Sequence, residues 1–60
     1  MVQTYKEIVK LWNSQPFLER VMFLMKLRFT QDLAEKIAKS DFNRINDTHR
    51  IIIFNELNKN

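Results

Sequence analysis

The stretch FLERVMFLMKL, residues 17–27, decides the fold because it is apolar on almost every side of a helix. Only Glu19, Arg20 and Lys26 interrupt its large apolar residues. In the chain as a whole, apolar residues recur at a spacing of about 3.6, which is typical of helices rather than strands. A helix with almost no solvent side is either the centre of its domain or the element that meets another chain.

The composition also favours helices. Glycine is absent from the 60 residues, and proline occurs once, at position 16. The tight turns of β-hairpins need positive φ angles and therefore favour glycine, so a sheet of several short strands is not expected. The sequence predicts an all-α fold, a small bundle of three to four short helices.

The boundaries of the helices follow from the apolar spacing and from polar residues at the helix ends. Tyr5 and Trp12 belong to the apolar face of the first helix. The segment NSQP, residues 13–16, ends this helix, and we expect Ser14 to be the N-cap of the second helix, with Pro16 in its first turn. Thr30 is the expected N-cap of the third helix. The predicted helices span about residues 4–13, 15–28, 31–39 and 41–58, within a single domain of residues 1–60.

A second apolar run, IIIFNEL at residues 51–57, lies near the end of the chain. On a continuous fourth helix, the inward stripe would consist of Phe42, Ile45, His49, Ile52, Ile53 and Leu57. Ile51 and Phe54 would lie off this stripe and would need a second surface. The alternative is a monomer of four helices, in which the second helix is the buried centre and Phe54 packs back near Tyr5.

A chain of this size usually needs a disulfide, a metal or a partner subunit to be stable. It contains no cysteine and one histidine, so a disulfide is excluded and neither a structural metal nor a cofactor is expected. We therefore predict that the bundle is completed by homodimerisation, since one self-complementary surface is enough for a two-fold dimer. The expected interface residues are Met22, Phe23, Met25, Ile51 and Phe54.

The net charge of +3 permits binding to a phosphate backbone or to an acidic partner without requiring either. The candidate contacts to nucleic acid are Lys36, Lys39, Arg44 and Arg50. Residues 30–45 superficially resemble a helix-turn-helix, but Lys39 and Arg44 stand where that motif has apolar residues.

Arg44 and His49 have the spacing R-x4-H, which resembles the minimal motif of HEPN-type ribonucleases. That resemblance implies a helix that presents both side chains to an RNA phosphate. Two residues at such a spacing occur often by chance, and HEPN domains are longer than this chain. We expect His49 at an internal or interface position instead, and we predict no catalytic residue.

Together these features predict a small non-enzymatic protein-interaction module that docks on a regulatory or DNA-binding protein. The alternative is a small basic helical protein that binds DNA or RNA as a dimer. The high content of Ile, Lys and Asn indicates an AT-rich genome, such as that of a bacterium, a phage or a plasmid. No apolar stretch approaches the roughly 20 residues of a membrane-spanning helix, and the N-terminus does not resemble a signal peptide, so we expect a cytoplasmic protein that contacts no membrane.

Overall fold

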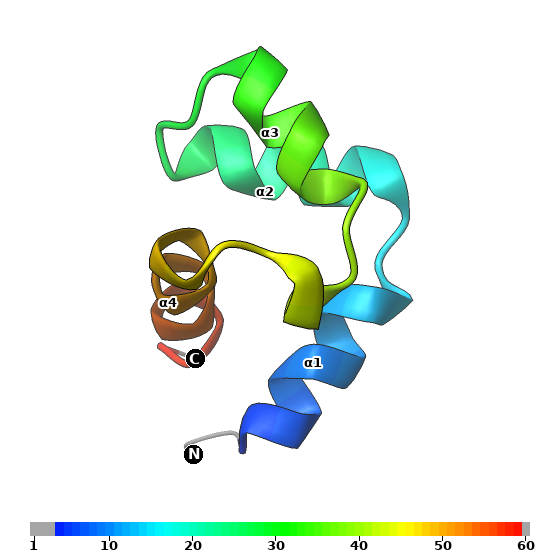
Figure 1. Ribbon diagram of the computed structural model, residues 1–60, viewed down its shortest axis with the longest axis vertical. Helices are drawn as coiled ribbons and strands as arrows, with labels where there is room; N and C mark the ends of the chain where they lie inside the picture. Colours follow the sequence, from blue (N-terminus) through cyan, green and yellow to red (C-terminus); the bar gives the residue numbers. More distant parts are fainter. Residues whose placement is uncertain (1–3, 60) are drawn as a thin grey trace.

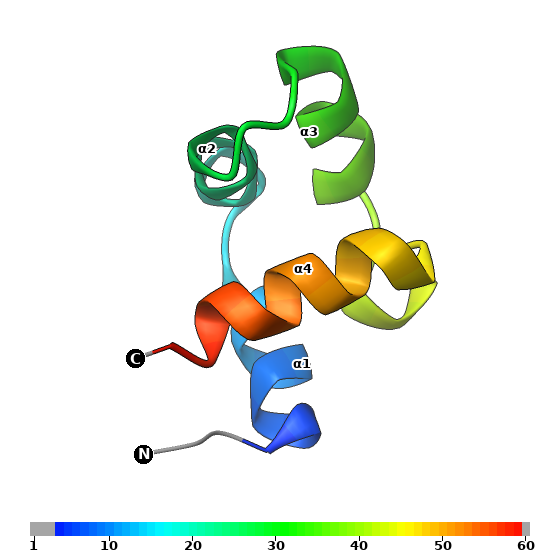
Figure 2. The same cartoon turned by 90° about the vertical axis from the view of Figure 1, so that its left-hand side faces the viewer.

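The regular structure of residues 4–59, which the computed structural model describes, is helical and contains no strand (Figures 1 and 2). The elements are α1 (Tyr5–Ser14), α2 (Phe17–Lys26), α3 (Gln31–Ala38), the 3-10 turn η1 (Phe42–Arg44) and α4 (Asp47–Leu57). The prediction of an all-α fold is confirmed.

Polar residues and one proline set where the helices begin. Thr4 caps α1 in a reciprocal arrangement: its Oγ1 accepts from the Glu7 N–H at 3.2 Å, and its own N–H donates to Glu7 Oε1 at 2.9 Å. The Thr4 hydroxyl also donates to Glu7 Oε1, at 3.0 Å. The hydrogen bond from the Thr4 N–H, and after it the one from the Thr4 hydroxyl, hold the pKa of the Glu7 carboxyl below its ordinary value. Thr30 caps α3 in the predicted way. The prediction for the second helix is wrong: Ser14 ends α1 instead of capping α2, and Pro16, with φ of −66°, stands directly before α2 and not in its first turn.

The C-terminal end of α2 turns sharply at a residue in the left-handed region. Arg28 has a φ of 76°, and its N–H donates to the carbonyl of Met25 at 3.0 Å. The next residue, Phe29, donates to the carbonyl of Leu24 at 3.2 Å. This pair of hydrogen bonds is a Schellman motif, which usually has glycine at the position of Arg28. The turn lays α3 beside α2 (Figures 1 and 2).

The predicted continuous helix over residues 41–58 is wrong. The 3-10 turn η1 is followed by Ile45 in an extended conformation (φ −75°, ψ 142°), and α4 begins only at Asp47. The break is stabilised by Asn46, whose side chain accepts from the Thr48 N–H at 2.9 Å, because asparagine favours caps over helix interiors. Since η1 rather than a second helix follows α3, the superficial likeness to a helix-turn-helix does not extend to the structure.

Ten apolar side chains form the core, and within residues 4–59 no polar or charged residue is buried with them. The core consists of Ile8, Trp12, Val21, Leu24, Ala34, Ile37, Ala38, Phe42, Ile45 and Ile53. Phe42 lies edge-on to Trp12, with ring centroids 6.4 Å apart, so η1 seals the core against α1. α4 runs across the direction of α2 rather than along it, and it packs on α1 (Figures 1 and 2).

Arg20 joins three helices at the edge of this core. Its guanidinium lies 5.6 Å from the centroid of the Trp12 ring and donates to three backbone carbonyls. These carbonyls belong to Asn13 (3.1 Å), Gln15 (3.0 Å) and Ala38 (2.9 Å). Asn13 and Ala38 lie in the last turns of α1 and α3, where carbonyl groups have no partner inside their own helix. A side chain of α2 therefore caps both neighbouring helices.

Candidate functional site

The outer side of α2 exposes a line of large apolar side chains. Leu18 is 67% exposed, Met22 54% and Met25 46%. Their spacing of four and three residues puts them along one side of the helix. Val21 and Leu24 of the same helix are buried in the core. We call Leu18, Met22 and Met25 the α2 face.

The predicted interface residues of α2 differ in their surroundings. Met22 and Met25 belong to the α2 face, whereas Phe23 is half-buried and meets Trp12 edge-on, with ring centroids 6.3 Å apart. The sequence interpretation missed Leu18, although its spacing to Met22 and Met25 was a usable signal. Three exposed apolar side chains of α2 thus form a regular line, while Phe17, at the start of the helix, is also exposed but lies off that line.

Two charged side chains lie beside the α2 face. Glu19 and Lys26 are both exposed and are seven residues apart, so they lie on the same side of α2. Neither side chain forms an ion pair or a hydrogen bond with any residue between 4 and 59. Together with Met22 and Phe23 they line a surface hollow of about 170 Å³. This flank of α2 therefore carries one free acid, one free base and room between them.

The apolar residues of α4 are placed differently from the prediction. Phe54 is half-buried and stacks on Tyr5, with ring centroids 6.1 Å apart and 26° between the planes. Ile52, predicted to be in the core stripe, is 40% exposed, and Ile51 is 60% exposed. The predicted core position of Ile52 is therefore wrong. Ile51 and Phe54 line one surface hollow beside Tyr5, and their place in the dimer interface stays a prediction. The alternative that Phe54 packs back near Tyr5 is confirmed.

The break before α4 explains these corrections. Because α4 does not continue from residues 42–45, those residues do not fix which side of α4 faces the core. The inward side of α4 is centred on Ile53. The half-buried residues beside Ile53 are His49, Arg50, Phe54, Glu56 and Leu57. Ile51 and Ile52 remain on the outer side, and we call these two residues the α4 face. Its charged neighbours are paired within the chain, Arg50 with Asp47 and Lys59 with Glu56.

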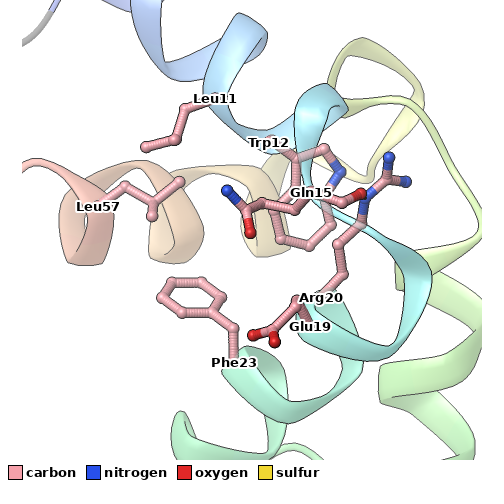
Figure 3. Close-up of a pocket in the computed structure, with 7 residues that line it drawn as sticks. All are labelled: Leu11, Trp12, Gln15, Glu19, Arg20, Phe23 and Leu57. Atoms are coloured by element: carbon pink, nitrogen blue, oxygen red, sulfur yellow. The ribbon is translucent and has the colours of Figure 1, made fainter.

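A cleft lies where α1, α2 and the end of α4 meet (Figure 3). Its volume is about 200 Å³. Figure 3 shows Phe23 reaching into it from α2, with Leu57 of α4 and Leu11 of α1 on the other sides. Cofactor and ligand pockets usually have at least about 300 Å³, so this cleft is of a size for one side chain rather than for a small molecule. Arg20 lines it, but its guanidinium is already engaged by backbone carbonyls.

The four candidate contacts to nucleic acid differ in their exposure and in their partners within the chain. Lys36, Lys39 and Arg44 are exposed, and no side-chain hydrogen bond or ion pair within residues 4–59 holds them. Arg50 is half-buried, pairs with Asp47, and donates to the carbonyl of Asn43 at 3.2 Å. Three of the four cations are therefore free to contact a phosphate, and the fourth has an internal role.

The R-x4-H pair does not lie on one helix. Arg44 belongs to η1, and His49 belongs to α4 beyond the break. His49 is half-buried and packs edge-on against Phe29, with ring centroids 5.4 Å apart. This is the internal position that we expected for it. Among the described residues, no three side chains of His, Asp or Glu gather in the way that a metal site needs.

The chain matches no protein-family model, no curated protein and no solved structure. Within residues 4–59, no helix has both the length and the apolar character required to cross a bilayer. The functional interpretation therefore depends on the surfaces described above.

Proposed function

We propose that this chain is a small non-enzymatic protein-interaction module that forms a homodimer and docks on another protein, of the regulatory or DNA-binding class. The observation that carries the proposal is the α2 face, where Leu18, Met22 and Met25 lie in line and are between 46% and 67% exposed. Methionine and leucine on a helix surface are typical of adaptable protein-binding sites.

The energetics of so small a chain support association. Burying one large apolar side chain fully contributes about 1.5–3 kcal/mol, while an entire domain of this length is stable by only about 3–9 kcal/mol. Covering the three side chains of the α2 face would therefore add a large fraction of the total stability. An interface of standard size takes about 800 Å² from each partner. That is about a sixth of the 4593 Å² of accessible surface of this chain.

Two separate apolar surfaces allow two kinds of contact. The α2 face and the α4 face lie on different helices that run crosswise to one another (Figures 1 and 2). Self-association can occupy one of them while the other stays open to the partner protein. This division would make the dimer an adaptor with two equivalent docking sites, since each copy contributes one.

Light scattering coupled to gel filtration tests the homodimer. We expect a mass of about twice 7.3 kDa at high micromolar concentration, falling toward 7.3 kDa on dilution. A mass of 7.3 kDa at every concentration would contradict the homodimer. Affinity capture from the source cells tests the docking function, with the wild type compared to Ile51→Glu and Met22→Glu. We expect at least one of the two variants to lose a regulatory protein that the wild type captures.

One observation favours nucleic-acid binding as a second candidate function. The side chains of Lys36, Lys39 and Arg44 are exposed and have no partner within residues 4–59. If all three contact phosphates, the logarithm of the binding constant for duplex DNA should fall with the logarithm of the salt concentration with a slope of about −2.7. Absence of binding at low salt would remove this candidate.

A further inference from the structure

We infer that the α2 face binds the α2 face of a second copy, with the two α2 helices antiparallel and Glu19 of each copy beside Lys26 of the other. The inference rests on the proposed homodimer and assigns its interface. It depends on the arrangement of five exposed residues around α2, not on apolar exposure alone. These residues are Leu18, Glu19, Met22, Met25 and Lys26.

The five residues form two flanks around Met22. Successive residues of an α-helix are about 100° apart around the axis. Leu18 and Met25 therefore lie about 40° and 60° to one side of Met22, and Lys26 and Glu19 lie about 40° and 60° to the other side. One flank is apolar and the other is charged. Each flank has one residue toward the start of α2 and one toward its end.

Consider a two-fold axis that passes close to Met22, lies in the plane between the two copies and runs at right angles to α2. This axis makes the two helices antiparallel. The apolar flanks of both copies then lie together on one side of the helix pair, and the charged flanks lie together on the other. Leu18 then lies next to Met25 of the second copy, and Glu19 next to Lys26 of the second copy. In both pairs the two residues are offset along the helix axis by the rise of a single residue, about 1.5 Å. Met22 meets its own symmetry mate in the centre.

The charges select the antiparallel orientation. In a parallel pair, the two-fold axis runs along the helices and places the charged flank of one copy against the apolar flank of the other. Glu19 would then lie against Leu18 of the second copy, and Lys26 against Met25, with both charges unpaired and partly removed from water. Only the antiparallel pair joins acid to base twice and apolar to apolar twice.

The surroundings of Glu19 provide room for the lysine of the second copy. The hollow lined by Glu19, Met22, Phe23 and Lys26 lies on the charged flank and has a volume of about 170 Å³. A lysine can lay its aliphatic stem along Met22 and Phe23 while its ammonium reaches the carboxylate. The α4 face also borders a hollow, of about 410 Å³, which Ile51 lines together with Tyr5 and Phe54. Its charged neighbours, however, are already paired within the chain, so it offers no free charge to a second copy. It stays open for a different protein.

Charge reversal tests the assignment. Glu19→Lys and Lys26→Glu should each weaken the homodimer about 5- to 30-fold, because two symmetry-related exposed pairs change from attraction to repulsion. The double variant should recover the wild-type dissociation constant, and an equimolar mixture of the two single variants should form a heterodimer. Lys36→Glu is the matched control, since it reverses an exposed and unpaired lysine on α3 and should leave dimerisation unchanged. The dissociation constants are measured by sedimentation velocity.

Cross-linking tests the orientation, since the chain contains no cysteine. A disulfide needs Cα atoms about 4.4–6.8 Å apart. In the antiparallel pair, Leu18→Cys should not cross-link with itself, because its two copies are separated by about 12 Å along the axis, but it should cross-link with Met25→Cys in a mixture. Cross-linking of Leu18→Cys with itself alone would overturn the inference.

The outcomes separate this inference from the proposed function. A wild type that is monomeric at high micromolar concentration overturns both the homodimer and the assigned interface. A wild-type dimer that is insensitive to Glu19→Lys and Lys26→Glu, but is dissociated by Ile51→Glu, overturns the assignment to α2 and leaves the homodimer intact. A dimer that responds to the reversals and recovers in the double variant supports both.

Discussion

α2 and α4 both carry more apolar residues than one buried side can hold, but they place the excess differently. α2 exposes Leu18, Met22 and Met25 in one outward line beside the unpaired charges of Glu19 and Lys26, with Phe17 exposed off that line. α4 turns Phe54 inward onto Tyr5 and leaves Ile51 and Ile52 outside, beside charges that are paired within the chain. On our proposal, exposed apolar area alone does not define a docking site. The free charges of Glu19 and Lys26 beside the α2 face are what we propose to distinguish it as the surface that meets a second copy.

The largest effect on stability should come from removing the hydrogen bonds that Arg20 of α2 makes to the neighbouring helices. Arg20→Ala removes charge-assisted hydrogen bonds to three carbonyls, and each such bond contributes about 1.5–3 kcal/mol before relaxation. We expect a loss of about 3 kcal/mol, which is enough to unfold much of the population of so small a domain. Circular dichroism during urea titration at low temperature measures it. Arg20→Lys keeps the charge without the planar fork, and it should lose less than Arg20→Ala.

The difference between two neighbours on α4 can be measured directly. Phe54→Ala removes the stacking on Tyr5 and leaves a gap beside the core, so we expect a loss of about 2 kcal/mol. Ile51→Ala changes a side chain that is 60% exposed, and in the monomer it should change the free energy of unfolding by less than about 0.5 kcal/mol. Equal effects of the two substitutions in urea titrations would contradict the placement of Phe54.

The end of α2 offers a stabilising substitution. Arg28 has a φ of 76°, a conformation that costs a residue with a Cβ about 1–2 kcal/mol and costs glycine much less. We expect Arg28→Gly to raise the free energy of unfolding by about 1 kcal/mol at most. Glycine also increases the conformational entropy of the unfolded chain, and this reduces the gain. Arg28→Ala is the control, since it removes the charge but keeps the Cβ. A gain in Arg28→Ala equal to that in Arg28→Gly would mean that the charge, not the backbone, was responsible.

The smallest effect concerns α1, on which α4 packs. The pKa of Glu7 is lowered by its hydrogen bonds to Thr4, the backbone one first, so the folded state binds a proton at this carboxyl less readily than the unfolded state does. Its contribution to stability is therefore complete above the pKa of the unfolded chain and is lost as the pH falls through the lower folded pKa. Glu7→Gln should flatten the acid side of the stability profile, as measured by thermal melts between pH 3 and pH 7. An unchanged profile would count against the capping role.

Much of the fold could be predicted from local signals. The absence of glycine and the apolar spacing predicted helices, and the cap at Thr30 acts over three residues and can be recognised in the sequence. The cap at Thr4 is equally local, but it was not predicted, because residue 4 was placed inside the first helix. The break before α4 was missed, because Asn46 and Asp47 can stand at a cap or on the outside of a continuous helix. Once the break was missed, the phase of α4 was wrong, and with it the positions of Ile52 and Phe54.

The other features missed depend on contacts between distant residues. Arg20 donates to the carbonyl of Ala38, which is 18 residues away, and no spacing in the sequence predicts that hydrogen bond. The spacing within α2 likewise does not show the contact of Phe23 with Trp12 of α1, while the place of Phe23 in the interface stays a prediction. The exposed line on α2 could have been found from the spacing of Leu18, Met22 and Met25, once the helices that cover the other side were known.

We propose above that the outer side of α2 joins two copies of this chain. Light scattering over a concentration series, with the wild type compared to Met22→Glu, tests it most directly. We predict about twice 7.3 kDa for the wild type and 7.3 kDa for Met22→Glu, with helical circular dichroism spectra that coincide. A wild type that stays at 7.3 kDa, or a folded Met22→Glu variant that dimerises as strongly as the wild type, would contradict it.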